Sequence, residues 1–157
     1  MNIKITTDST CDLSAEQLKR HNIELFPLCI SMGDKCLRDG LEITPDDIYA
    51  HVAAGGDICT TSALNIADYS DRFSVLSKEY DAVIHLNISA EFSSCYQNAV
   101  LAAQEFDNVY VVDSRNLSTG HGHVVLRAAE LAESGMDAQE IVNTLNVFTG
   151  KVDASFI

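Results

Sequence analysis

The chain of 157 residues has few basic side chains, and they are outnumbered by acidic ones. Ten lysines and arginines stand against 23 acidic residues, giving a formal net charge of −13. Proteins bind nucleic acids and anionic membrane surfaces through basic patches, so this charge balance argues against both as partners. No turn carries a lysine cluster, which argues against a polyphosphate ligand as well. A single carboxylate could still be held by hydroxyl and backbone N–H groups.

The sequence also lacks long apolar runs. Hydrophobic residues make up 46% of the chain, but no segment approaches the length of a membrane span. The amino terminus, MNIKITTDST, shows no signal-peptide pattern. We therefore expect a cytoplasmic protein that is not inserted in a membrane, and the length predicts one domain.

No CxxC motif occurs, and the cysteines are odd in number and scattered (Cys11, Cys29, Cys36, Cys59 and Cys95). We expect most of them to be small buried hydrophobic residues. His121 and His123 have the wrong spacing for two metal ligands on one helix face, so no metal site is predicted.

Apolar segments alternate with segments of helical periodicity. Strands are expected at 3–6, 24–32, 82–88 and 109–112, with a short hairpin return at 36–40. Helices are expected after Ser14, from Pro45 to about Val52, at 66–80, from 96, at 121–135 and at 138–148. Pro27 is expected at a sheet edge or strand start. This alternation predicts an α/β protein with a mostly parallel sheet flanked by helices.

Four turns rich in hydroxyl side chains follow or adjoin the expected strands, at 7–10, 60–62, 89–94 and 113–120. Ligands of parallel α/β sheets bind beyond the carboxyl ends of the strands, so we expect the four turns to converge on one site. At the third turn, the serines lead into the helix expected from 96, whose unpaired first N–H groups favour an anion. The alternative is that Ser93 only caps that helix.

A catalytic triad of Ser93, Asp113 and either His121 or His123 would make the protein a serine hydrolase. No G-x-S-x-G motif surrounds any serine, which weakens this alternative. The glycines of the 118–122 segment do not have the spacing of a phosphate loop. They are expected to permit close packing or close approach of a ligand.

Taken together, six segments resemble the DegV family. They are TDSTCDL (7–13), PLCI (27–30), DG followed by TPDDIY (39–49), TTS (60–62), ISAEFSSCYQNA (88–99) and DSRNLSTGHG (113–122). The resemblance covers nearly the whole chain and identifies it as a DegV-like N-terminal α/β domain over 1–157. It implies two α/β domains with an acyl chain between them, of which this chain would lack the second.

The resemblance implies a non-catalytic bacterial protein that binds a long-chain fatty acid and needs no cofactor. Some members carry the fatty acid to a kinase that phosphorylates its carboxylate. By analogy, Thr61 and Ser93 would bind the carboxylate, with Ser62 and Ser94 beside them. A supporting set would comprise Asp8, Ser9, Ser118 and Gly120.

The chain departs from the family's pattern at two of these segments. The family commonly has T-S-Q-P-S where this chain has TSALN (61–65), and two glycines of its I-S-S-G-L-S-G-T-Y segment are Glu91 and Ser94 here. An inward-pointing Glu91 would repel a carboxylate. The alternative function is therefore an interaction or regulatory domain without lipid binding. An uncovered interdomain face would further favour a homodimer.

Overall fold

A computed structural model describes residues 1–155 as two connected sheets of different kinds. The larger sheet has four parallel strands in the order β2-β1-β6-β7. These strands are β1 (Ile3–Asp8), β2 (Glu24–Phe26), β6 (Ala82–Asn87) and β7 (Val109–Asp113). The prediction of an α/β fold with a parallel sheet flanked by helices is confirmed.

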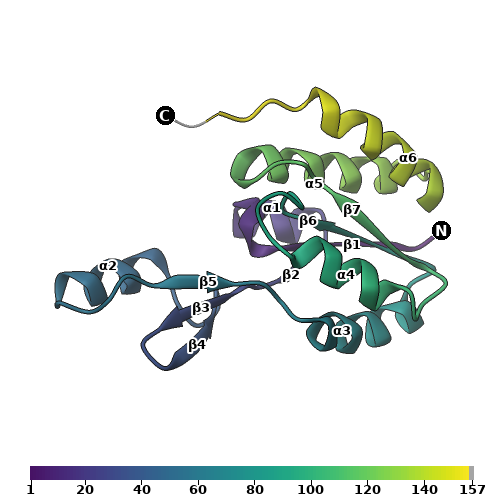
Figure 1. The fold of residues 1–157 in the computed structure, drawn as a ribbon. Coiled ribbons are helices and arrows are strands. Elements are labelled where there is room, and N and C mark those ends of the chain that lie inside the picture. Colours follow the sequence, from purple (N-terminus) through teal and green to yellow (C-terminus); the bar gives the residue numbers. More distant parts are fainter. Residues whose placement is uncertain (156–157) are drawn as a thin grey trace.

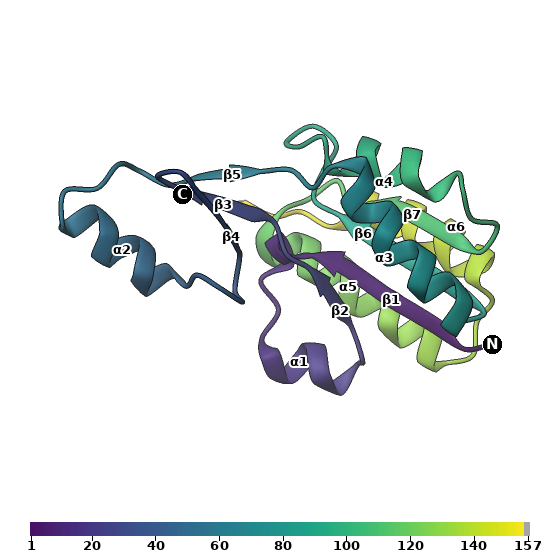
Figure 2. The same cartoon turned by 90° about the horizontal axis from the view of Figure 1, so that it is seen from below.

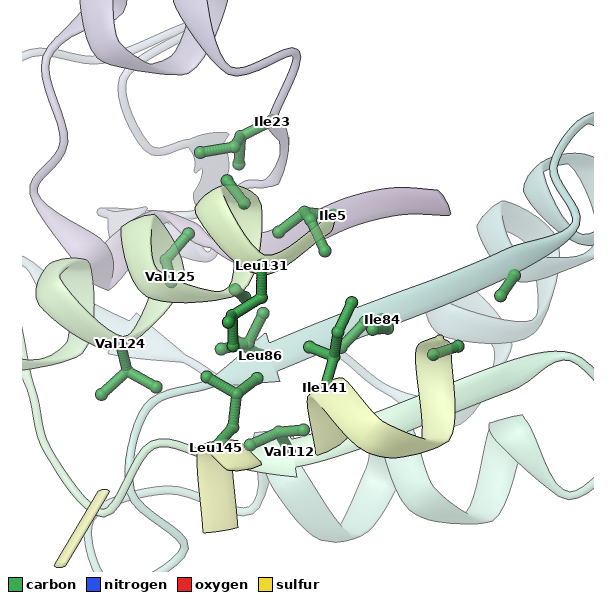
Figure 3. Packing of buried hydrophobic residues seen from close by; sticks show 14 of the residues in the cluster. Ile5, Ile23, Ile84, Leu86, Val112, Val124, Val125, Leu131, Ile141 and Leu145 are labelled. Carbon is green, nitrogen blue, oxygen red and sulfur yellow. The ribbon is translucent and has the colours of Figure 1, made fainter. Parts of the chain in front are cut away.

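Helices cover both faces of the parallel sheet (Figure 1). They are α1 (Ala15–Arg20), α3 (Ile66–Glu79), α4 (Cys95–Ala103), α5 (Ser118–Glu133) and α6 (Ala138–Phe148). One core contains the α5 and α6 side chains against Ile84, Leu86 and Val112, as Figure 3 shows. A second core packs α3 and α4 against the opposite face through Phe26, Val83 and other apolar residues. The alternation of side chains along β6 supplies both cores, because successive residues point to opposite faces.

A second, antiparallel sheet of three strands projects from this body (Figures 1 and 2). Its strands are β3 (Cys29–Met32), β4 (Lys35–Arg38) and β5 (Thr60–Ser62), and α2 (Pro45–Ala53) lies between β4 and β5. We call residues 29–62 the hairpin lobe. None of the α2 side chains is buried, although the helix has a capping box at Thr44 and a proline in its first turn.

The apolar run at 24–32 forms two strands rather than the single one expected. The parallel strand β2 ends at Phe26, and β3 begins at Cys29 in the other sheet. Pro27 lies between them, where its missing N–H breaks no ladder bond. The run therefore leaves the edge of the parallel sheet and enters the hairpin lobe.

The remaining expected elements are confirmed to within a few residues, with one exception. Helix α5 begins at Ser118, three residues before the expected start at His121. Gly120 lies in this additional turn, where a Cβ would lie 2.6 Å from the Asn116 side-chain oxygen. The first turn of α5 can therefore pack against the preceding turn only without that side chain.

Candidate functional site

Three of the four hydroxyl-rich turns meet at the carboxyl edge of the parallel sheet. Strands β1, β6 and β7 end at Asp8, Asn87 and Asp113, and Asn87 pairs directly with Asp113 in the sheet register. Parallel strands place all these ends at one edge, where ligands of such sheets bind. The expected convergence is confirmed for the turns after β1, β6 and β7.

The fourth segment, 60–62, does not end a strand of that sheet. It is itself strand β5 of the hairpin lobe, so the expected placement is wrong. In the register of β3 and β5, Thr61 lies opposite Ile30, and Ser62 lies opposite Cys29. Because successive residues of a strand face opposite sides, Thr61 and Ser62 present their hydroxyl groups on different faces of the lobe. Both residues are exposed.

The hairpin lobe is tied to the carboxyl edge of the parallel sheet where it begins and just beyond its end. At the beginning, the backbone N–H of Leu28 donates to Ser9 Oγ at 3.2 Å. Beyond the end, the side-chain amide of Asn98 in α4 donates to the Leu64 carbonyl at 2.7 Å. The Ser9 oxygen thus supports the lobe, and β5 ends two residues before the contact with α4.

The turn after β6 presents the hydroxyl groups of Ser93 and Ser94. The Cys95 N–H donates to Ser93 Oγ at 3.2 Å, so Ser93 accepts one bond and keeps its own hydrogen for donation. Ser94 is the N-cap residue of α4, but its side chain makes no capping bond. The capping contact expected of Ser93 is therefore present, although Ser93 lies one residue before the N-cap position. Ser93 is half-buried and Ser94 is exposed.

Asp8 is fully buried behind this turn. One carboxylate oxygen accepts from the backbone N–H of Thr10 at 3.1 Å and from its hydroxyl at 2.6 Å. The other accepts from the backbone N–H of Ile88 at 2.8 Å. The carboxylate of Asp8 therefore joins the ends of β1 and β6 and organises the site from inside.

A buried histidine, His121, lies beside Asp8. Its Nε2 is 3.0 Å from Thr7 Oγ1, and its Nδ1 is 3.1 Å from Thr10 Oγ1. Burial lowers the pKa of this imidazole, so it is neutral at pH 7 even though an Asp8 oxygen lies 3.8 Å away. His121 is a hydrogen-bonded part of the core at this edge.

A second buried histidine, His85, lies in β6 among aromatic rings. Its Nδ1 is 2.8 Å from Thr6 Oγ1, and burial lowers its pKa to about 3. Within the described part of the chain, His85 Nε2 and Asn87 Oδ1 have no hydrogen-bond partner. Buried polar atoms of this kind are often satisfied by internal water.

The remaining predicted residues, Ser118 and Gly120, both lie in the first turn of α5. Ser118 Oγ donates to Asp12 Oδ2 at 2.6 Å, which links α5 to the turn after β1. Gly120 is buried and makes the close approach to Asn116. These residues fix the position of α5 beside the site.

The acid and the histidines of the alternative catalytic triad contact groups other than Ser93. Asp113 Oδ1 accepts from the backbone N–H groups of Ala90 and Arg115 at 3.2 and 2.8 Å. His121 forms hydrogen bonds with threonines, and the exposed His123 packs against Phe148 with the rings tilted and their centroids 5.5 Å apart. No hydrogen bond within residues 1–155 joins either histidine to Ser93.

Two features of the site were not anticipated from the sequence. The buried network of Asp8, Thr10 and His121 joins residues more than a hundred positions apart, and periodicity carries no signal for such contacts. The expectation that most cysteines are buried is also wrong. Cys11 and Cys95 are buried and free, whereas Cys29 and Cys36 form a disulfide across β3 and β4.

None of the described helices combines the length and apolar character needed to cross a membrane. Nor do the described histidine, cysteine and acidic side chains form a group of three or more that could hold a metal ion.

The four-stranded parallel sheet with its projecting antiparallel lobe defines an α/β fold, and comparison with known proteins identifies its family. The profile of the family described as "Uncharacterised protein, DegV family" matches residues 2–157. The chain belongs to the DegV family. A DegV domain-containing protein of Clostridium perfringens is 36% identical over 141 residues, which cover 88% of this chain and 50% of the relative.

Solved structures of the same family have the same fold. A DegV family protein from Thermus thermophilus, described by its fatty acid binding, is 37% identical with a TM-score of 0.87. DegV from Bacillus subtilis, described as a fatty acid binding protein, is 29% identical with a TM-score of 0.88. The match covers 95% of this chain and 54% of the Thermus chain, and 96% and 54% for the Bacillus chain. The chain thus spans about half the length of the relatives it matches.

Proposed function

We propose that the chain binds a long-chain fatty acid and does not act as a catalyst. The observation that carries this proposal is a set of exposed or half-buried hydroxyl groups at the start of α4 and along β5, without a lysine in either segment. Hydroxyl groups and the unpaired N–H groups of a helix N-terminus suit a ligand with one negative charge. The descriptions of the Thermus and Bacillus proteins support a fatty acid as that ligand.

Ser93 and Thr61 are the primary carboxylate ligands in this proposal. Ser93 has a hydrogen to donate, because its oxygen already accepts from Cys95 N–H. Thr61 would contribute its hydroxyl from β5 of the hairpin lobe, and Ser94 would add one from the N-cap of α4. Ser62 lies on the other face of β5 from Thr61, so it contributes less to the same carboxylate.

Exposed apolar side chains close in sequence to these hydroxyl groups favour an apolar tail. Phe92 is 62% exposed and precedes Ser93, and Ile58 is 83% exposed and lies three residues before Thr61. Exposed apolar surface beside polar groups is a common mark of a ligand or partner site. Each methylene group of an acyl chain would add about 0.8 kcal/mol of binding free energy when buried.

In the cell, the protein would act as a cytoplasmic acyl carrier that presents the fatty acid to a kinase. The carboxylate would lie at the exposed edge, where a kinase could reach it. A homodimer could cover the apolar side chains around the site. Light scattering tests this part, since a monomer at high protein concentration would contradict the dimer.

The binding proposal is tested by replacing Thr61 and Ser93 with alanine together. Oleate affinity, measured by calorimetry, should fall about tenfold to a hundredfold for each hydrogen bond lost to the charged head group. Ser77→Ala is the matched control, because this α3 residue lies at the opposite end of the sheet, near Asn108. An unchanged affinity in the double variant, with both proteins folded, contradicts the proposed site.

The alternative function, an interaction domain that binds no lipid, rests on Glu91. Its side chain is exposed on the turn that holds Ser93. Mass spectrometry of an organic extract from the purified protein separates the two functions. A stoichiometric fatty acid supports the carrier. An empty extract from the wild type together with oleate binding by Glu91→Gly would show that this acid excludes the carboxylate.

A further inference from the structure

The hairpin lobe brings two cysteines together on one face of its sheet. The Cα atoms of Cys29 and Cys36 are 5.5 Å apart, and the two residues form a disulfide. Ser31 lies opposite Cys36 in the register, and side chains two positions apart on a strand share a face. We propose that this pair is a site of reversible thiol–disulfide exchange with a low-molecular-weight thiol that carries both carboxylate and ammonium groups.

The two cysteine residues differ in exposure. Cys36 is exposed and Cys29 is half-buried. Exchange requires a thiolate to attack one sulfur of the disulfide, so the attack falls on Cys36. Both cysteines line a cleft of about 280 Å³ between the lobe and α3. The incoming thiol is therefore held in this cleft while it reacts.

Charged groups of both signs line the same cleft. Arg38 of β4 lies opposite Cys29 in the register, and Arg72 of α3 lines the cleft with it. Asp68 and Asp71 of α3 line it as well. Guanidinium groups pair with carboxylates, and carboxylates pair with ammonium groups. A small thiol with both charges has partners here that a neutral thiol lacks.

Both arginines have donors left for such a ligand. Arg38 lies 3.9 Å from Glu42, Arg72 lies 3.7 Å from Glu24, and one N–H of Arg72 donates to the Leu25 carbonyl at 3.3 Å. These distances exceed those of a charge-assisted hydrogen bond, about 2.8 Å. Each guanidinium carries five N–H groups, so it can bind a carboxylate without releasing its acidic neighbour.

The exchange proceeds in two balanced steps. The incoming thiolate attacks Cys36 Sγ, the bond between Cys36 and Cys29 breaks, and Cys29 leaves as a thiolate beside Arg38. A positive neighbour of this kind stabilises a thiolate. A second thiolate then attacks the sulfur of the bound thiol and releases Cys36, so two small thiols become one disulfide and the protein gains two thiols. The reverse sequence restores the protein disulfide.

The exchange site is separate from the proposed Thr61 contact. Cys29 shares its face of the lobe with Ser62, whereas Thr61 points to the other face. The proposal therefore does not depend on fatty-acid binding, and its failure would leave the carboxylate site unaffected.

The test uses the oxidised 157-residue chain with reduced glutathione, 2-mercaptoethanol or cysteamine at equal thiolate concentrations. Intact mass and peptide mapping follow the adduct on the hairpin and the gain of two thiols. We expect glutathione to react about tenfold faster than 2-mercaptoethanol because the cleft attracts its charges. The variant Arg38→Gln with Arg72→Gln should remove this preference, and Arg127→Gln should leave it unchanged.

Other cysteines are controlled in the same experiment. Cys59→Ser removes the remaining partly exposed thiol, and burial raises the pKa of the Cys11 thiol to about 11, which keeps it protonated. Three results would overturn the proposal. They are the absence of a disulfide between Cys29 and Cys36 in the oxidised chain, equal rates for the three thiols in the unaltered protein, and adducts confined to Cys59.

Discussion

At the scale of single residues, a buried carboxylate holds the candidate site together. Asp8 accepts hydrogen bonds from the backbone and the hydroxyl of Thr10, in the turn after β1, and from the backbone N–H of Ile88, directly after β6. The distance of 2.8 Å to the Ile88 N–H is that of a charge-assisted bond. The position of the turn that carries Ser93 therefore depends on a side chain that does not reach the surface.

Replacement of Asp8 by alanine should destabilise the protein. The Ile88 and Thr10 N–H groups would lose their acceptor in a buried environment, which costs about 2–4 kcal/mol of unfolding free energy. Urea unfolding followed by circular dichroism measures this loss. Asp107→Ala is the control, because Asp107 is exposed, and its unfolding free energy should change by less than about 0.5 kcal/mol. Equal stability of the two variants would contradict the role of Asp8.

The sequence predicted the residue types of the site better than their partners. Hydroxyl groups at the ends of strands are visible in the sequence, and Ser93 and Ser94 indeed follow β6. The contacts of His121 with Thr7 and Thr10 depend on which strands become neighbours. Local pattern carries no record of that choice, so these bonds could not be predicted.

At the scale of elements, Pro27 divides the apolar run 24–32 between two sheets. The run reads as one strand because its composition is uniform, and only the absence of a proline N–H marks the break. The consequence for the site is large. Residues 60–62 form strand β5, which pairs with β3 in the lobe, and the alternation along this strand directs Thr61 and Ser62 to opposite faces.

Helix α2 should be much less protected against amide exchange than α5. It buries no side chain, whereas α5 buries eight residues. The free energy of local opening rises with the amount of buried packing that the opening must break, so α2 amides should exchange on the order of 100-fold faster than those of α5. Hydrogen–deuterium exchange with mass spectrometry measures both helices in one sample. Equal protection would show that α2 is covered in solution, for example by a second copy of the chain.

At the scale of the whole molecule, buried neutral histidines should make stability depend on pH. Burial lowers the pKa of His85 from 6.5 to about 3, and it lowers that of His121 as well. Between about pH 3 and pH 6.5, His85 binds a proton in the unfolded chain but not in the folded chain. The stabilising contribution is therefore complete above pH 6.5 and is lost as the pH falls.

The unfolding free energy should fall by about 1.4 kcal/mol per pH unit for His85 below pH 6.5, with His121 acting in the same direction. Urea unfolding at pH 7, 6 and 5 measures the slope. His85→Gln should reduce the slope, because glutamine does not titrate, and the exposed His123→Gln should not. A slope unaffected by His85→Gln would mean that this histidine is not buried in its neutral form.

The sequence by itself determined the class of fold, the family and most of the element boundaries. Alternating apolar and helical patterns act over a few residues, and they fix local structure because burial of one face rewards the matching period. The same local signals placed hydroxyl groups after β1, β6 and β7. Composition also determined that any anionic ligand must be held without a lysine cluster.

Only the tertiary structure decided the second sheet, the buried network around Asp8 and the pairing of Cys29 with Cys36. Each of these features depends on which strands become neighbours in the folded chain. The observed arrangement minimises unsatisfied backbone groups and exposed apolar surface over the entire chain. Because this balance is global, a pattern of a few residues cannot encode it, and the division of the site between the parallel sheet and the lobe became visible only in the folded molecule.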